Sequence, residues 1–190
     1  MKRAGLWLVG VATLVGCFRS KTPPVQKPRG FPRVALPAKS YVPLLMDCPF
    51  TFMIPVYAEV APYRDSKKKC WFNLKFKPFK ATLHFTYAHI GRHLSSFTED
   101  SRTLAYKHLT RSIGIREEKI IDPVNRVYGI IYYIDGDVAS TCQFHFTDSV
   151  KHFLRGSFYF DIHTEPDSVA PVREFLHQDV AVIAQTLRWK

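Results

Sequence analysis

Acidic residues are scarce in this sequence, and the short motifs of several enzyme classes are missing. It contains 16 Asp and Glu against 27 Lys and Arg, which gives a formal charge of +11 at pH 7. It has no G-x-G-x-x-G or Walker loop, which argues against a nucleotide cofactor. It has no H-x-H, H-E-x-x-H or C-x-x-C spacing and no G-x-S-x-G elbow around Ser149, so neither a metal site nor a serine hydrolase is indicated. The sequence therefore predicts no cofactor and no metal ion.

Length and charge bound the organisation of the chain. With 190 residues, 46% of them hydrophobic, it can form one well-packed domain. Two of the eleven net positive charges are Lys2 and Arg3, so +9 remains without them. A charge of this sign indicates acidic surroundings, whether nucleic acid, anionic lipid head groups or an acidic protein partner.

The first residues have the pattern of an export signal. Two positive charges precede an apolar run at 4–16 that is too short for a settled transmembrane helix. The run ends in L-V-G-C, which matches a bacterial lipobox, where the cysteine sulfur receives a diacylglycerol. We therefore predict a signal peptide at 1–16 and lipidation at Cys17, with a plain signal peptide and an incidental cysteine as the alternative. Each buried acyl methylene contributes about 0.8 kcal/mol, so a multiply acylated cysteine would hold the protein on a membrane.

Residues 17–40 are predicted to form a tether between the lipid and the domain. From Ser20 to Lys39 the chain has five prolines and no acidic residue, which is typical of an extended linker. A basic tether beside an anchor would also meet anionic head groups, at about 1 kcal/mol per basic residue; a solvated spacer is the alternative. Known surface-exported lipoproteins of some bacteria carry acidic residues directly after the lipidated cysteine. This chain does not resemble them there, which favours an anchor that faces the periplasm, on either the inner or the outer membrane.

The stretch from Cys142 to Phe160 is expected to form the central hairpin of the domain. Cys142, Phe144 and Phe146 alternate with polar residues, and a second alternating run begins at Leu154. A period of two is the signature of strands with one buried face. One face of this hairpin is rich in phenylalanine and needs a cover.

Similar patterns predict the other elements. Strands are expected at 48–55, 70–76, 80–89 and 126–134. A helix is expected after Gly91 and up to Gly114; Ser96 and Glu99 have capping-box spacing, although Arg92 could already be helical. A second helix is expected from Asp167 to Leu187, and Glu117, Glu118 and Lys119 are expected in a polar turn. This order predicts a single α+β domain at 41–190, with an antiparallel β-sheet packed by helices on one face.

The three cysteines of the predicted domain have two expected roles. In an exported chain, Cys48 and Cys70 at the starts of two strands are a possible disulfide pair. Cys142 is left over on the buried face of the hairpin, where it would act as a small hydrophobic residue.

Histidines on the polar faces of the strands are the candidate catalytic residues. If the strands pair as expected, His84, His145 and Asp161 lie on one side of the sheet and could do acid-base work or bind a metal. We favour the simpler interpretation of a solvent-facing sheet surface, which is normally lined with such residues, and therefore predict no catalytic residue; the His84, His145 and Asp161 site is the weaker alternative. Basic and aromatic residues also alternate from Phe72 to Lys80, as in some nucleic-acid-binding strands. Because an exported lipoprotein rarely meets nucleic acid, we expect no nucleic-acid partner.

Motifs spread over nearly the whole mature chain together resemble one known family. They are the lipobox, C-P-F-T-F with C-W-F-N-L, A-T-L-H-F-T-Y from Ala81, E-D-S-R-T-L-A-Y-K-H from Glu99, R-V-Y-G-I-I-Y from Arg126, Q-F-H-F-T-D-S-V-K-H-F-L-R-G-S-F-Y-F from Gln143, and the terminal W-K. The chain resembles the gliding motility lipoprotein GldD family. The resemblance carries over Cys17 as the lipidation site and no catalytic residue.

The resemblance implies a cell-envelope protein needed for gliding motility and for the type IX secretion system. Its partners would be other gliding and type IX secretion envelope proteins, and the membrane through its lipid anchor. We therefore expect a non-enzymatic accessory or assembly factor. Two alternatives stay open: an envelope hydrolase that uses His84, His145 and Asp161, and a module that binds polyanions such as lipopolysaccharide or peptidoglycan through its +9 charge.

Overall fold

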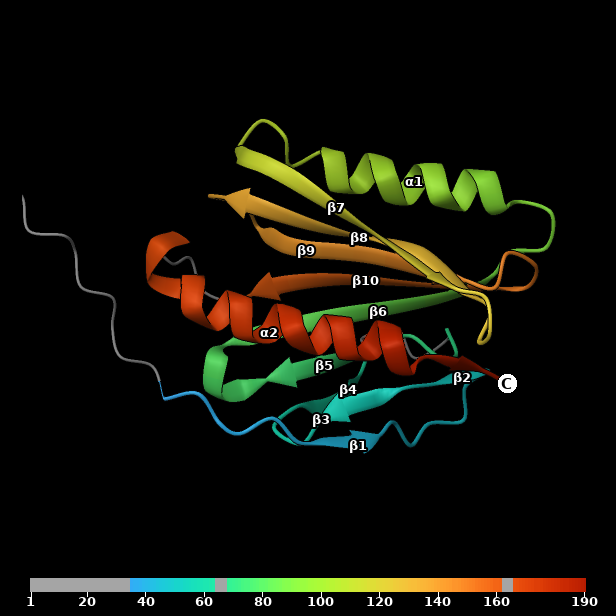
Figure 1. Ribbon diagram of the computed structural model, residues 1–190, viewed down its shortest axis with the longest axis horizontal. Coiled ribbons are helices and arrows are strands. Elements are labelled where there is room, and N and C mark those ends of the chain that lie inside the picture. Colours follow the sequence, from blue (N-terminus) through green and yellow to red (C-terminus); the bar gives the residue numbers. More distant parts are fainter. Residues whose placement is uncertain (1–34, 64–67, 162–165) are drawn as a thin grey trace, which may run out of the picture. The chain divides into compact units, whose positions relative to one another are not determined.

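A seven-stranded antiparallel sheet forms the centre of the structure, with helix α2 lying across it (Figure 1). The computed structural model describes residues 35–63, 68–161 and 166–190. The predictions for the signal peptide, for Cys17 and for most of the tether therefore lie outside the described residues. The structure confirms the α+β class and the antiparallel sheet.

The strand order in the large sheet is β4-β5-β6-β10-β9-β8-β7, and all neighbours are antiparallel. The strands are β4 (Glu59–Pro62), β5 (Phe72–Phe76), β6 (Ala81–His89), β7 (Ser112–Asp122), β8 (Val127–Gly136), β9 (Ser140–Thr147) and β10 (His152–Phe160). A short 3-10 helix, Lys77–Phe79, joins β5 to β6.

The predicted hairpin is the β9–β10 pair at the middle of the sheet. Phe144 lies opposite Gly156 in the register, and a Cβ built at Gly156 would stand 2.0 Å from the Phe144 ring. The aromatic ring thus occupies the space above the glycine. All eight residues of β9 are buried, which means that both faces of this strand are covered.

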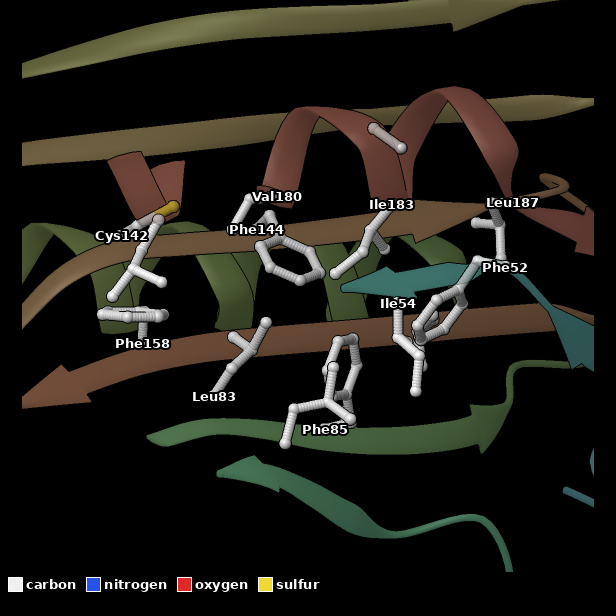
Figure 2. Close-up of a cluster of buried hydrophobic side chains, with 14 of the residues drawn as sticks. Phe52, Ile54, Leu83, Phe85, Cys142, Phe144, Phe158, Val180, Ile183 and Leu187 are labelled. Atoms are coloured by element: carbon white, nitrogen blue, oxygen red, sulfur yellow. The ribbon is translucent and has the colours of Figure 1, made fainter. Parts of the chain in front are cut away.

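Helix α2 (Pro166–Thr186) covers the phenylalanine-rich face, as expected. Side chains from α2, from strands β5, β6, β8, β9 and β10 of the large sheet, and from the N-terminal segment meet in one cluster, part of which is shown in Figure 2. Each such fully buried side chain contributes about 1.5–3 kcal/mol. The residues labelled there are Phe52, Ile54, Leu83, Phe85, Cys142, Phe144, Phe158, Val180, Ile183 and Leu187.

Helix α1 (Leu94–Tyr106) packs on the opposite face, so the expectation of helices on one face is wrong in this respect. Phe97 lies against Phe153 with ring centroids 5.3 Å apart, and Tyr106 meets Tyr132 edge-on at 6.3 Å. These rings belong to the face that also carries the polar residues of β9. The physical reason for the difference is that Phe153 and Tyr132 also need to be buried, and α1 covers them.

Two other boundaries differ from the prediction. Residues 112–122, including the expected turn at 117–119, form the edge strand β7, because an edge tolerates charged side chains that face water. Helix α1 ends at Tyr106, well before Gly114, and its N-cap is His93. The predicted Ser96/Glu99 capping box therefore does not mark the start of the helix.

Two small sheets and a disulfide attach the N-terminal segment. Strand β1 (Tyr41–Pro43) pairs with β3 (Met53–Pro55), and β2 (Phe50–Thr51) pairs with β11 (Arg188–Trp189) near the C-terminus. The sulfurs of Cys48 and Cys70 are bonded, with their Cα atoms 5.7 Å apart. This bond links the segment before β2 to the start of β5 in the large sheet.

Candidate functional site

A hollow of about 430 Å³ lies at one end of the sheet, where three distant segments of the chain meet. They are the turn between β7 and β8, the loop between β9 and β10, and strand β11 with Lys190. Figure 1 shows these segments together at the end marked C. The second and third segments belong to the motifs that carry the resemblance, the long run from Gln143 and the terminal W-K.

The lining of this basic hollow is strongly positive. Its basic side chains, Arg126, Lys151, Arg188 and Lys190, are all exposed. Within the described chain, none of the four takes part in a salt bridge. Arg188 and Lys190 act at longer range on Asp122 and Asp47, whose pKa values their charges help to lower. The lining still has an excess of positive charge for a partner of opposite sign, and screening by salt will weaken any such interaction.

Asp148 lines the same hollow, but its carboxylate is engaged by the backbone. Oδ1 accepts hydrogen bonds from the N–H groups of Val150, Lys151 and His152 at 2.9, 2.7 and 2.8 Å. Burial acts to raise the pKa of Asp148, and these three donors outweigh it, so that the pKa lies below its ordinary value. The carboxylate thus holds the β9–β10 loop in shape.

Two stacked aromatic rings form part of the wall. The ring of Trp189 lies parallel to that of His152, with an interplanar angle of 10° and centroids 5.2 Å apart. Trp189 Nε1 also donates a hydrogen bond to the carbonyl oxygen of Arg126 at 3.0 Å. Burial lowers the pKa of His152, although the charge of Asp148 opposes this. These contacts join all three segments and give the hollow a defined wall.

The three candidate residues do not form one site, because His145 lies apart from His84 and Asp161. Burial lowers the pKa of His84, and the nearby charge of Asp161 opposes this. His84 Nδ1 lies 2.7 Å from Oδ1 of Asn73, while Asp161 Oδ1 accepts a hydrogen bond from Thr82 at 3.0 Å. His145 is on the same face, but strand β10 separates its strand from that of His84. At the usual strand spacing the two histidines are about 10 Å or more apart. His84 and Thr82 instead line a second, open hollow of about 400 Å³.

His145 lies inside the protein and does not face water. Its ring stacks on Phe153 at 5.3 Å and is 4% exposed, and its Nδ1 has no hydrogen-bond partner in the described structure. Burial, with the nearby charge of Arg155, lowers the pKa of His145 to about 4. The imidazole is therefore neutral at pH 7, as a packing residue would be.

Three further features are the free cysteine, the possible metal ligands and the possible membrane-spanning helices. Cys142 is a free thiol in the core, and burial raises its pKa. Among the described residues, no three His, Cys, Asp or Glu side chains are grouped so as to hold a metal ion. No helix in this part of the chain combines the length and hydropathy needed to cross a membrane.

A buried charged cluster was missed at the sequence level. Asp179 of α2 is 1% exposed and accepts hydrogen bonds from Lys39, Tyr41 and Tyr57 at 2.6, 2.9 and 2.6 Å. Burial raises the pKa of both tyrosines, and the hydrogen bond to Asp179 acts in the same direction. A signal was present, because Asp179 follows Phe175 by one helical turn on the apolar stripe of α2.

Comparisons with known proteins give one family and one distant fold relative. The sequence model of the family described as "Gliding motility lipoprotein GldD" matches residues 21–189. No curated protein matches the chain. The solution structure of cyanobacterial PsbP (CyanoP) from Synechocystis sp. PCC 6803 is similar over 84% of this chain and 98% of that chain, with 12% sequence identity and a TM-score of 0.47. We draw no functional conclusion from a structural likeness of this degree.

Proposed function

Since the chain belongs to the gliding motility lipoprotein GldD family, we propose that it is a lipid-anchored accessory or assembly factor of gliding motility and type IX protein secretion. It acts without catalysis, by binding other envelope components of this machinery. Cys17 carries the lipid, residues 17–40 form the tether, and the folded domain at 41–190 faces the periplasm.

The observation that carries this proposal is the extent of the family match. It covers residues 21–189 and therefore all of the described structure except Lys190, including residues from all three segments of the basic hollow. A lipoprotein of this family is held in the cell envelope by its lipid. The domain consequently meets its partners at a membrane surface, where a short tether raises their effective concentration.

A non-catalytic role agrees with the geometry of the polar face. His84 and Asp161 are hydrogen-bonded to neighbouring polar side chains, and His145 is packed between aromatic rings beneath α1. General acid-base catalysis needs the acting groups within hydrogen-bond reach of the same substrate atom or its water. His145 lies a strand away from the other two residues, and His84 and Asp161 are each hydrogen-bonded to a different side chain.

The first test is a deletion strain that is assayed for colony spreading and for its secreted proteome, with rescue by the wild-type gene. We expect loss of type IX cargo from the medium, together with loss of spreading in a host that glides. Rescue by a Cys17→Ala variant that is still exported and stable would show that the anchor is not part of the mechanism. Normal secretion and spreading in the deletion strain would contradict the proposal itself.

The same strain separates a binding role from an enzymatic one. We expect a His84→Ala, His145→Phe and Asp161→Asn triple variant to restore secretion fully once its folding has been verified by circular dichroism. If the folded triple variant fails to rescue, the hydrolase alternative takes the place of the accessory role.

A further inference from the structure

We propose that the basic hollow binds a phosphate-bearing saccharide, the chemistry found in the inner part of lipopolysaccharide. This inference uses the envelope location of the family and does not depend on the accessory role. The hollow would give the protein a second attachment in the envelope, separate from its lipid and its protein partners.

The charges of the hollow point to an anionic ligand. Arg126, Lys151 and Arg188 approach it from three different segments, and none of them forms a salt bridge with a described carboxylate. Arg188 Nη1 donates to the carbonyl oxygens of Gln185 and Leu187, and the charge of Arg188 also helps to lower the pKa of Asp122. The carboxylate of Asp148 is turned to the backbone by its three N–H donors. Guanidinium groups hold phosphate oxygens through two parallel hydrogen bonds, a geometry that suits Arg126, while Arg188 keeps the donors that its Nη1 does not use for the backbone.

The wall of the hollow points to a sugar as the carrier of the phosphate. Trp189 and His152 present a stacked aromatic pair next to the basic side chains. An aromatic surface packs against the apolar face of a sugar ring, while the lysines and arginines reach its phosphate and hydroxyl oxygens. The volume of about 430 Å³ is in the range of small-ligand sites.

The backbone around the hollow argues against an extended acidic peptide. Peptides in extended form are commonly held by free backbone groups of a sheet edge. Here the loop amides of 150–152 are bound to Asp148, the Arg126 carbonyl accepts from Trp189, and the Lys190 amide donates to the Pro49 carbonyl at 3.0 Å. These groups are already used, so the recognition must come from side chains.

The test measures binding of defined probes to the full-length acylated protein in a neutral detergent. Isothermal titration calorimetry compares a bisphosphorylated glucosamine disaccharide, the same disaccharide without phosphate, inorganic phosphate and a poly-glutamate peptide. We expect the phosphorylated disaccharide to bind most tightly, with an affinity that falls as salt rises. Equal binding of the unphosphorylated sugar, of inorganic phosphate or of the acidic peptide would overturn the assigned ligand class.

A charge-matched pair of variants locates the site. The first carries Arg126→Gln, Lys151→Gln and Arg188→Gln; the control carries Arg92→Gln, Lys107→Gln and Lys119→Gln, exposed positions outside the hollow. Since one lost charge-assisted contact is worth about tenfold or more, we expect the hollow variant to bind at least roughly tenfold more weakly. The control should stay within about twofold. Equal weakening of both variants would mean that general surface charge is responsible, and it would overturn the site.

Discussion

Lys39 Nζ lies 2.6 Å from Oδ1 of Asp179, and this ion pair joins the end of the predicted tether to helix α2. The same ammonium group donates to the Phe175 carbonyl at 2.6 Å and lies 3.4 Å from the centroid of the Phe175 ring. Burial lowers the pKa of Lys39, against the opposing effect of Asp179. Residue 39 therefore belongs to the folded domain as much as to the tether.

Removal of one partner of this pair should be strongly destabilising. A Lys39→Met variant leaves the Asp179 carboxylate buried with only the two tyrosine hydroxyls as donors. We expect the free energy of unfolding in urea to fall by about 3–5 kcal/mol. The double variant Lys39→Met with Asp179→Leu should lose less than the sum of the single variants, since no unpaired charge remains. Strict additivity in this double-mutant cycle would show that the two side chains are not coupled.

The disulfide should stabilise the domain against unfolding. The bond between Cys48 and Cys70 spans a sequence separation of 22, and a loop of this size contributes about 3 kcal/mol. We expect a Cys48→Ser and Cys70→Ser double variant to unfold at correspondingly lower urea concentration. Reducing agent should destabilise the wild-type protein and leave the variant unaffected. Equal stability of oxidised wild type and variant would contradict this prediction.

His145 should make the domain sensitive to acid. Its pKa is lowered from 6.5 to about 4 in the folded protein, so the unfolded chain binds the proton more readily. The stabilisation that comes from keeping His145 neutral is fully present above pH 6.5. It is lost as the pH falls towards about 4.

A His145→Phe variant tests this, because it keeps a ring in the stack and removes the titration. We expect its loss of unfolding free energy over this pH range to be smaller than that of wild type, by up to about 3 kcal/mol. His89→Gln, at an exposed position, serves as the control and should follow wild type. His177, whose pKa burial lowers to about 3, will keep a residual acid dependence.

Gly156 should not accept a side chain while Phe144 lies above it. The Cβ of an alanine would stand 2.0 Å from the ring, so the ring or the strand must move. We expect Gly156→Ala to destabilise the domain by about 1–3 kcal/mol in thermal unfolding. In the background of Phe144→Leu the same substitution should be less harmful, since the shorter side chain leaves room. An equal effect in both backgrounds would mean that the contact is not responsible.

Much of the fold could be predicted because its pattern is local. Buried faces are predicted by the alternating phenylalanines of β9 and β10, with the period of a strand, and by the apolar stripe of α2, with the period of a helix. Strand β7 could not be recognised in this way, because the charged residues Arg116, Glu117 and Glu118 are typical of a solvated turn. Their strand conformation follows from the pairing of β7 with β8, which the local sequence does not show. The second face of β9 was misjudged because His145 and Gln143 are polar and yet buried beneath α1.

The candidate site depends on contacts that no local pattern contains. Lys151 and Trp189 stood in the motifs that carried the resemblance, but their proximity follows from the pairing of β11 with β2 and from the shape of the β9–β10 loop. The Lys39 contact likewise links residues 140 positions apart. For Asp179 alone the local sequence indicated a buried, paired carboxylate, because it is an acidic residue on the apolar stripe of α2.

The position of Lys39 has a mechanical consequence. Strand β1 pairs with β3 over only three residues at the border of the domain, so tension on the preceding chain could peel it away one residue pair at a time. Lys39 comes before that strand and is fixed to the long helix over the main core. A pull from the membrane would therefore load helix α2 first, and β1 would be shielded until the ion pair broke.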